Sequence, residues 1–141
     1  MLAVVDTGPL VAVADAKDPY HAQARAFMEG TPHRLIVPVL AIGEAAFLIM
    51  SRLGPAAEAS FIAGIAEMNI EAPHPSDWRR ISDLMSTYRD FPLGTVDACV
   101  IALAERLNTD LIVTFDHRHF RAIRPRHVDA FRLVPELDTT R

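Results

Sequence analysis

The sequence contains very little of three features that define many small proteins: cysteine, lysine and long uncharged segments. Its one cysteine, Cys99, excludes an internal disulfide and argues against a zinc site built on thiolates. Lys17 is the only lysine among 14 lysine and arginine residues. Uncharged segments such as residues 35–43 are far shorter than the ~20 residues that span a bilayer, and no basic region precedes the apolar residues 1–5. We therefore expect no membrane span, no export signal and a reducing, cytoplasmic location.

The composition is that of an ordinary folded domain. Hydrophobic residues make up 50% of the 141 residues and charged residues 23%, which favours a buried core over disorder. The net charge of -4 excludes a protein that coats nucleic acid through bulk positive charge. The length predicts a single domain over residues 1–141.

Short apolar segments alternate with longer segments of helical periodicity. The predicted strands are residues 2–5, 35–37, 69–72, 111–114 and 130–133. The predicted helices are a short one after Gly8-Pro9 and residues 19–28, 39–53, 56–68, 76–88 and 95–107, with Thr95 as the cap of the last. Continuous apolar strands joined through helices predict a three-layer α/β/α domain with a mainly parallel sheet of four or five short strands. Ligands bind such sheets beyond the carboxyl ends of the strands.

Four carboxylates stand in apolar surroundings. Asp6 and Asp116 each follow a predicted strand, whereas Glu44 and Asp97 have apolar neighbours three and four positions away on predicted helices. Each acid alone has a simpler interpretation, since Asp6 and Asp116 suit turns and Asp97 suits the first turn of a helix. Burial on the apolar stripe of a helix is unusual for Glu44.

Together, these acids predict a metal site. Two acids at strand ends and two on inward helix faces can converge at one edge of a parallel sheet. Carboxylates 4 Å apart repel by about 4 kcal/mol at an effective dielectric constant of 20, so such a cluster must take up protons or a cation. Oxygen ligands favour Mg²⁺, with Mn²⁺ as a substitute, and suit hydrolysis of phosphate esters.

Four motifs give the sequence a family resemblance. They are VVDTGPL at residues 4–10, VPVLAIGE at 37–44, YRDFPLGTVDA at 88–98 and TFDHRHF at 114–120. Their order and spacing resemble those of PIN-domain ribonucleases, and specifically of the VapC toxins of bacterial toxin–antitoxin pairs. The resemblance covers nearly the whole chain.

The resemblance implies a Mg²⁺-dependent endoribonuclease whose acidic quartet is Asp6, Glu44, Asp97 and Asp116. By resemblance, Asp6 and Asp97 are the firmest metal ligands, and the hydroxyl of Thr114 orients water or the cluster. The family further implies a homodimer and inhibition by a cognate VapB-type antitoxin, whose C-terminal segment covers the active site. The sequence departs from its relatives at His117, where they often carry arginine.

A basic segment follows Asp116. Residues 117–132 contain five arginines and three histidines, opposed only by Asp129. One interpretation is that this segment contacts RNA phosphates through Arg118, Arg121, Arg124 and Arg126. The alternative is a solvated loop. His117 and His119 could also be metal ligands, although an oxygen-rich set already suits Mg²⁺.

Other functions fit the motifs less well. A receiver domain would need adjacent acids after the first strand and a lysine after the last, and a haloacid-dehalogenase-type phosphatase would need two aspartates separated by one residue. A PIN-like RNA- or protein-binding module without catalysis would lack one or more of the four acids. We expect Trp78 and Cys99 in the core. Residues 47–50 and 61–65 either join the core or form a dimer or antitoxin surface.

Overall fold

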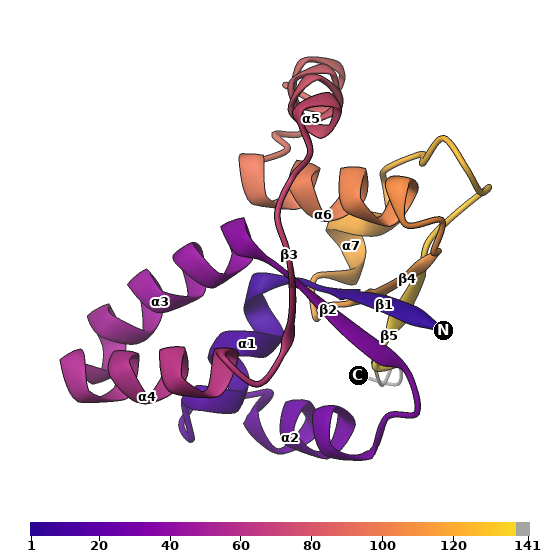
Figure 1. Ribbon diagram of the computed structural model, residues 1–141. Helices are drawn as coiled ribbons and strands as arrows, with labels where there is room; N and C mark the ends of the chain where they lie inside the picture. Colours follow the sequence, from indigo (N-terminus) through magenta and orange to yellow (C-terminus); the bar gives the residue numbers. More distant parts are fainter. Residues whose placement is uncertain (138–141) are drawn as a thin grey trace.

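The computed structural model describes residues 1–137, which form a three-layer α/β/α arrangement (Figure 1). The elements are β1 (Leu2–Val5), α1 (Thr7–Ala14), α2 (His21–Gly30), β2 (Arg34–Pro38), α3 (Val39–Leu53), α4 (Pro55–Ile65), β3 (Asn69–Glu71), α5 (Pro75–Thr87), α6 (Thr95–Arg106), β4 (Leu111–Val113), α7 (His117–Arg121) and β5 (Arg132–Val134). The five strands lie in the order β3-β2-β1-β4-β5, and every pairing is parallel. The predicted fold class is therefore confirmed.

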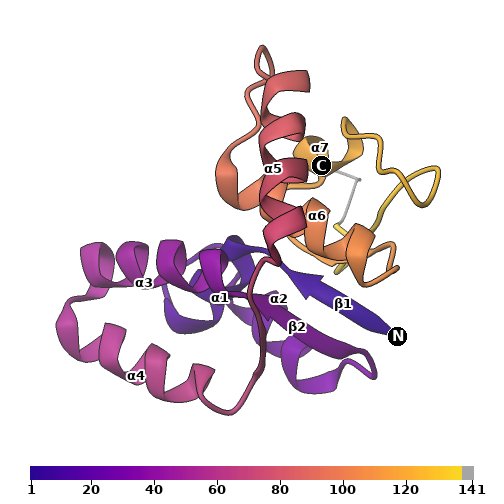
Figure 2. The ribbon, with the colours of Figure 1, turned by 45° about the horizontal axis from the view of Figure 1, so that its top comes forward.

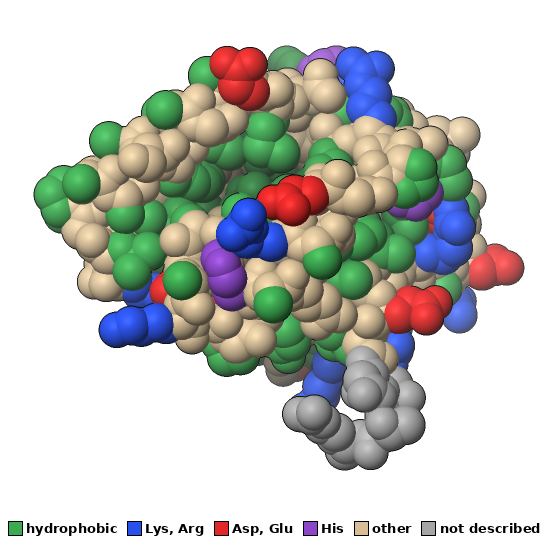
Figure 3. Space-filling view, turned by 90° about the horizontal axis from the view of Figure 1, so that it is seen from below, with side chains coloured by type: hydrophobic (Ala, Val, Ile, Leu, Met, Phe, Trp, Pro, Cys, Tyr) green, Lys and Arg blue, Asp and Glu red, His purple; other side chains and the backbone are tan. Residues whose placement is uncertain are grey.

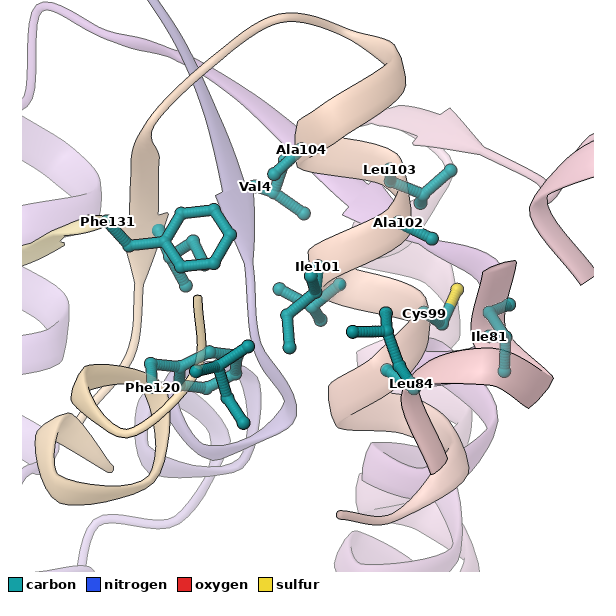
Figure 4. Close-up of a cluster of buried hydrophobic side chains, with 14 of the residues drawn as sticks. Val4, Ile81, Leu84, Cys99, Ile101, Ala102, Leu103, Ala104, Phe120 and Phe131 are labelled. Atoms are coloured by element: carbon teal, nitrogen blue, oxygen red, sulfur yellow. The ribbon is translucent and has the colours of Figure 1, made fainter. Parts of the chain in front are cut away.

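The central strand β1 separates two hydrophobic clusters. Val4 packs on one face of the sheet with residues of α5, α6 and α7, and Figure 4 shows this cluster with Leu84, Ile101 and Phe120. Ala3 and Val5 point to the opposite face, where α1 and α3 pack. In Figure 2 the helices α5 and α6 likewise lie apart from α1–α4. Both faces of the sheet are covered near its centre, which explains why β1 and β4 are apolar throughout.

Most predicted elements are present, but some of their ends differ. The helix predicted to begin at Pro19 begins at His21, because the Asp18 side chain accepts the backbone N–H of Tyr20 at 2.9 Å and stabilises a turn there. Thr95 is the first residue of α6, and the cap is Gly94. The short helix α7 was not predicted within the basic segment.

Trp78, expected in the core, and Phe47, expected either in the core or on a partner surface, are both exposed. Trp78 is 48% exposed, because α5 instead buries Asp77, Ile81 and Leu84. Phe47 is 69% exposed, because the buried stripe of α3 consists of Ala41, Ala45 and Ile49. Cys99 is buried as predicted. Within residues 1–137, no helix combines the length and the apolar character needed to cross a membrane.

Candidate active site

The adjacent parallel strands β1 and β4 end at the same edge of the sheet and place the first two site residues. Asp6 follows β1, and its backbone N–H donates to the carbonyl of Val113 at 2.9 Å. Thr114 follows β4, is fully buried, and donates its hydroxyl to Asp6 Oδ2 at 2.8 Å. Two residues 108 positions apart in the sequence are thus directly bonded.

All four predicted carboxylates line one cavity of about 500 Å³ at this edge. Asp6 caps α1, Glu44 lies on α3, Asp97 lies in the first turn of α6 and Asp116 caps α7. Each comes from a different crossover of the chain, so the sheet topology brings them together.

Asp6 is the most deeply buried of the four, at 7% exposure. Its Oδ1 accepts the backbone N–H of Thr7 at 2.8 Å. Burial, followed by the negative charge of Asp97, raises the pKa of Asp6 to about 6, despite the opposing effect of the hydrogen bonds from Thr114 and Thr7. The carboxylate is therefore held in an environment that disfavours its own charge.

The other three acids lie nearer to solvent. Burial, and to a lesser extent Asp116, raises the pKa of Asp97, whose side chain is 27% exposed. Burial and the charge of Asp97 also raise the pKa of Glu44. Glu44 is nevertheless exposed, so its predicted place on the inward stripe of α3 is wrong: it lies beside that stripe, at the edge of the cavity.

The donor chemistry of the cavity fits a hard divalent cation. Carboxylate oxygens are the preferred protein ligands of Mg²⁺ and Mn²⁺, and a cation would relieve the repulsion that raises these pKa values. Among residues 1–137, no three His, Cys, Asp or Glu side chains are already gathered into a metal-binding group.

His119 lies between two of the acids, a position that the sequence did not reveal. Its Nδ1 is 3.1 Å from Asp116 Oδ2, and its Nε2 is 3.8 Å from Asp97 Oδ2. Phe91 packs edge-on against the imidazole, with ring centroids 4.5 Å apart. The three-residue spacing from Asp116 is the signal that could have indicated this contact, had α7 been predicted.

An arginine and an aromatic pair line the same cavity. Arg52 Nη1 lies 3.3 Å from Asp18 Oδ2 and 3.6 Å from Asp15 Oδ2. The rings of Tyr20 and Phe115 are stacked, with centroids 4.3 Å apart and planes 7° from parallel. Sequence reasoning identified neither feature, because both depend on contacts between residues far apart in the sequence.

The basic segment is arranged differently from the acids. His117 is buried, its Nε2 is 3.1 Å from the Thr114 carbonyl, and burial lowers its pKa, so the neutral ring has a packing role. Arg124 and Arg126 are fixed through their backbone N–H groups, which donate to Tyr88 and Glu105 respectively. All four candidate arginines (Arg118, Arg121, Arg124 and Arg126) are exposed, and in residues 1–137 none is among those lining the acidic cavity.

Comparison with known proteins gives a consistent result. The PIN domain family profile matches residues 3–124. The chain is 29% identical over 134 residues to Ribonuclease VapC26 of Mycobacterium tuberculosis, covering 94% of this chain and 99% of that protein. The fold is similar to that of M. tuberculosis VapC20, a sarcin-ricin loop cleaving toxin, with a TM-score of 0.77 and 19% identity over 83% of this chain and 91% of that one. It is also similar to a chain of a toxin–antitoxin complex from Klebsiella pneumoniae, with a TM-score of 0.68 and 18% identity over 86% of this chain and 92% of that one.

Proposed function

The chain belongs to the PIN-domain family, and from that premise we propose that it is a divalent-metal-dependent endoribonuclease, the toxin of a toxin–antitoxin pair. The observation that carries the proposal is the meeting of Asp6, Glu44, Asp97 and Asp116 in one cavity. The likeness to a ribonuclease over almost the full length of both chains supports the same reading. The proposed place of action is the cytoplasm, where the RNA substrate is found.

The four acids and Thr114 have different proposed roles, according to how deeply each side chain is buried. Asp6 and Asp97 would hold Mg²⁺ or Mn²⁺, with Asp116 and Glu44 completing the site directly or through water. When bound, the ion supplies Lewis-acid stabilisation of the phosphate and lowers the pKa of a coordinated water. Thr114 fixes Asp6 through the 2.8 Å hydrogen bond and so sets the direction of the carboxylate.

The exposed position of Glu44 suits proton transfer. Its raised pKa and its exposed place at the cavity edge suit it to accept a proton from an attacking water. In-line attack on phosphorus would leave 5′-phosphate and 3′-hydroxyl ends.

We also propose a VapB-type antitoxin and a second copy of the chain as partners. The solved relatives include toxin–antitoxin complexes. Exposed apolar side chains lie along α3 and α4, among them Phe47, Met50 and Ile62. An apolar cavity of about 410 Å³ between α1, α2 and α4 lies on the face shown in Figure 3, where hydrophobic side chains gather in a hollow. Large exposed apolar areas of this kind mark interaction surfaces.

The decisive experiment compares Asp97→Asn with Asp83→Asn, an exposed carboxylate on α5. The purified proteins are incubated with total RNA and Mg²⁺, or with EDTA, and the cut ends are mapped. We expect Asp97→Asn to lower the cleavage rate by at least about 100-fold, the usual cost of losing one charge-stabilising group at an active site. Asp83→Asn should cleave normally.

Cleavage that survives Asp97→Asn or EDTA would contradict the metal-dependent mechanism. RNA binding without cleavage by the unaltered protein would favour the alternative, a PIN-like binding module. Release of phosphate from small esters, with RNA left intact, would instead favour a phosphatase.

A further inference from the structure

We propose that the stacked rings of Tyr20 and Phe115 form a platform on which an unpaired nucleobase of the RNA substrate stacks. This inference rests on the proposed ribonuclease function and identifies the part of the site that holds a base. Both rings line the same cavity as the four carboxylates. Phe115 stands between Thr114, which bonds Asp6, and Asp116, so the platform is adjacent in sequence to the acidic residues.

The pair presents a flat, parallel aromatic surface. The centroids are 4.3 Å apart and the planes differ by only 7°, so the two rings form one stack. Tyr20 remains 39% exposed in a cavity lined by polar and apolar residues alike. A flat aromatic surface open to solvent beside a phosphate-cleaving site is the arrangement on which bases stack in single-stranded RNA complexes.

Hydrogen bonds and ion pairs hold Tyr20 in place before any ligand arrives. Asp18 Oδ1 accepts the Tyr20 backbone N–H at 2.9 Å, and Asp18 Oδ2 lies 3.3 Å from Arg52 on α3. Arg52 is thus a positioning residue, since it links the loop that carries Tyr20 to the helix that carries Glu44. Such preorganisation lowers the cost of ordering the site on binding.

The lining of the cavity suits two parts of a nucleotide. The four carboxylates require a cation, so they suit a phosphate bridged by metal. Arg52, which lines the same cavity as the rings, pairs with Asp15 and Asp18 and partly offsets their charges. A cavity of about 500 Å³ lies within the range of small-ligand sites. The substrate therefore presents an unpaired base next to the cut site, as in a loop or single strand.

The test is a double-mutant cycle between the ring and the base. The substrate is a synthetic RNA carrying the mapped cut site, together with copies in which one abasic nucleotide is placed in turn at each position flanking the cut. Tyr20→Leu removes the ring, Tyr20→Phe retains it, and Trp78→Leu is the matched control, because Trp78 is exposed on α5 and lines a different cavity. All variants are compared by kcat/KM and by thermal unfolding.

Base stacking on an aromatic ring corresponds to an effect of about 5- to 150-fold. One abasic position should lower kcat/KM of the unaltered protein by that factor and have almost no further effect in Tyr20→Leu. Tyr20→Phe should restore the dependence on the base, and Trp78→Leu should behave like the unaltered protein. If Tyr20 has only a structural role, Tyr20→Leu should lower kcat/KM equally on the intact and abasic substrates. This result would overturn the proposed platform.

Failure of the two proposals can be told apart. If the unaltered protein cleaves the RNA but no abasic position interacts with Tyr20, the platform is wrong and the nuclease stands. If Tyr20→Leu unfolds at a lower temperature, Phe115→Leu provides a second cycle with the same abasic RNAs, and absence of coupling there also overturns the platform. If the unaltered protein cleaves no RNA, both proposals fail.

Discussion

Replacement of Asp6 by asparagine should make the metal-free protein more stable, although Asp6 is proposed to hold the ion. Burial, and then the charge of Asp97, raises the pKa of Asp6 from 3.8 to about 6. A carboxyl group whose pKa is raised in the folded state binds its proton more tightly there, so folding stability falls as the pH rises from 3.8 to 6. At about 1.36 kcal/mol per pH unit, the ionised Asp6 costs the folded chain about 3 kcal/mol at pH 8.

The hydrogen bonds of Asp6 reduce the expected gain. An asparagine can keep the bond from the Thr7 backbone N–H, because its side-chain oxygen is an equivalent acceptor. The bond from the Thr114 hydroxyl would have to be reversed or lost, at a cost of about 1 kcal/mol. We therefore expect a net stabilisation of about 1–2 kcal/mol at pH 8. At pH 5 the gain should be smaller by about 1.4 kcal/mol, because most of Asp6 is already protonated in the folded protein.

Urea unfolding at pH 5 and pH 8 in EDTA measures this difference, with Asp83→Asn as the exposed control. Added Mg²⁺ should stabilise the unaltered protein by binding its folded state and should stabilise Asp6→Asn less. An Asp6→Asn protein that is less stable than the unaltered one by the same amount at both pH values would refute the electrostatic reasoning.

Two further predictions concern the rest of the molecule. Glu105→Gln should lower the free energy of unfolding at pH 7 by about 2 kcal/mol, because Glu105 accepts two hydrogen bonds from Arg80, at 2.7 and 2.8 Å, and one from the Arg126 backbone. Burial alone would raise the pKa of Glu105, but these partners hold it below 4.5. The stability that the charge of Glu105 contributes is therefore present above pH 4.5 and is lost as the pH falls through the folded pKa. Urea titrations at pH 7 and pH 4 should show that the difference in stability between the variant and the unaltered protein is smaller at pH 4. Replacing both Arg118 and Arg121 with alanine should flatten the log–log dependence of single-stranded RNA binding on salt by about 1.4, at about 0.7 per phosphate contact. An unchanged slope would mean that these arginines only face solvent.

Apolar patterning predicted the central strands best, because β1 and β4 are almost completely buried, whereas the edge strands β3 and β5 are partly exposed. Residues 2–5 match β1 completely, and the other strand ends lie within two residues of the prediction. The helix over residues 39–53 is also as predicted, ending where Gly54 adopts a positive φ of 92°. At such positions one local preference, either burial or a left-handed backbone, decides the conformation.

Elements that depend on tertiary contacts could not be predicted in this way. The helix α7 has only five residues, and its place is set by the burial of Phe120 against the sheet and by the cap from Asp116 to the His119 backbone. The exposure of Trp78 depends on which face of α5 meets α6, and the charged Asp77 takes a buried position there by pairing with Arg106 at 2.8 Å.

The candidate site shows the same difference between residues with a local sequence signal and residues placed by tertiary contacts. The acids were identifiable because a carboxylate in an apolar segment is a local anomaly, and the topology places all four in one cavity. Tyr20 and Phe115 have no such signal: each is an ordinary aromatic in its own segment, and only the approach of the α1–α2 loop to the end of β4 makes them a pair.

The insertion of β4 beside β1 has a consequence for protein synthesis. Asp6 precedes its partner Thr114 by 108 positions, so β1 is synthesised well before β4, the strand that leads to Thr114. An incomplete nascent chain therefore has a central strand with one vacant edge and no assembled acidic cavity. The proposed site therefore forms only after β4 has been synthesised and has paired with β1.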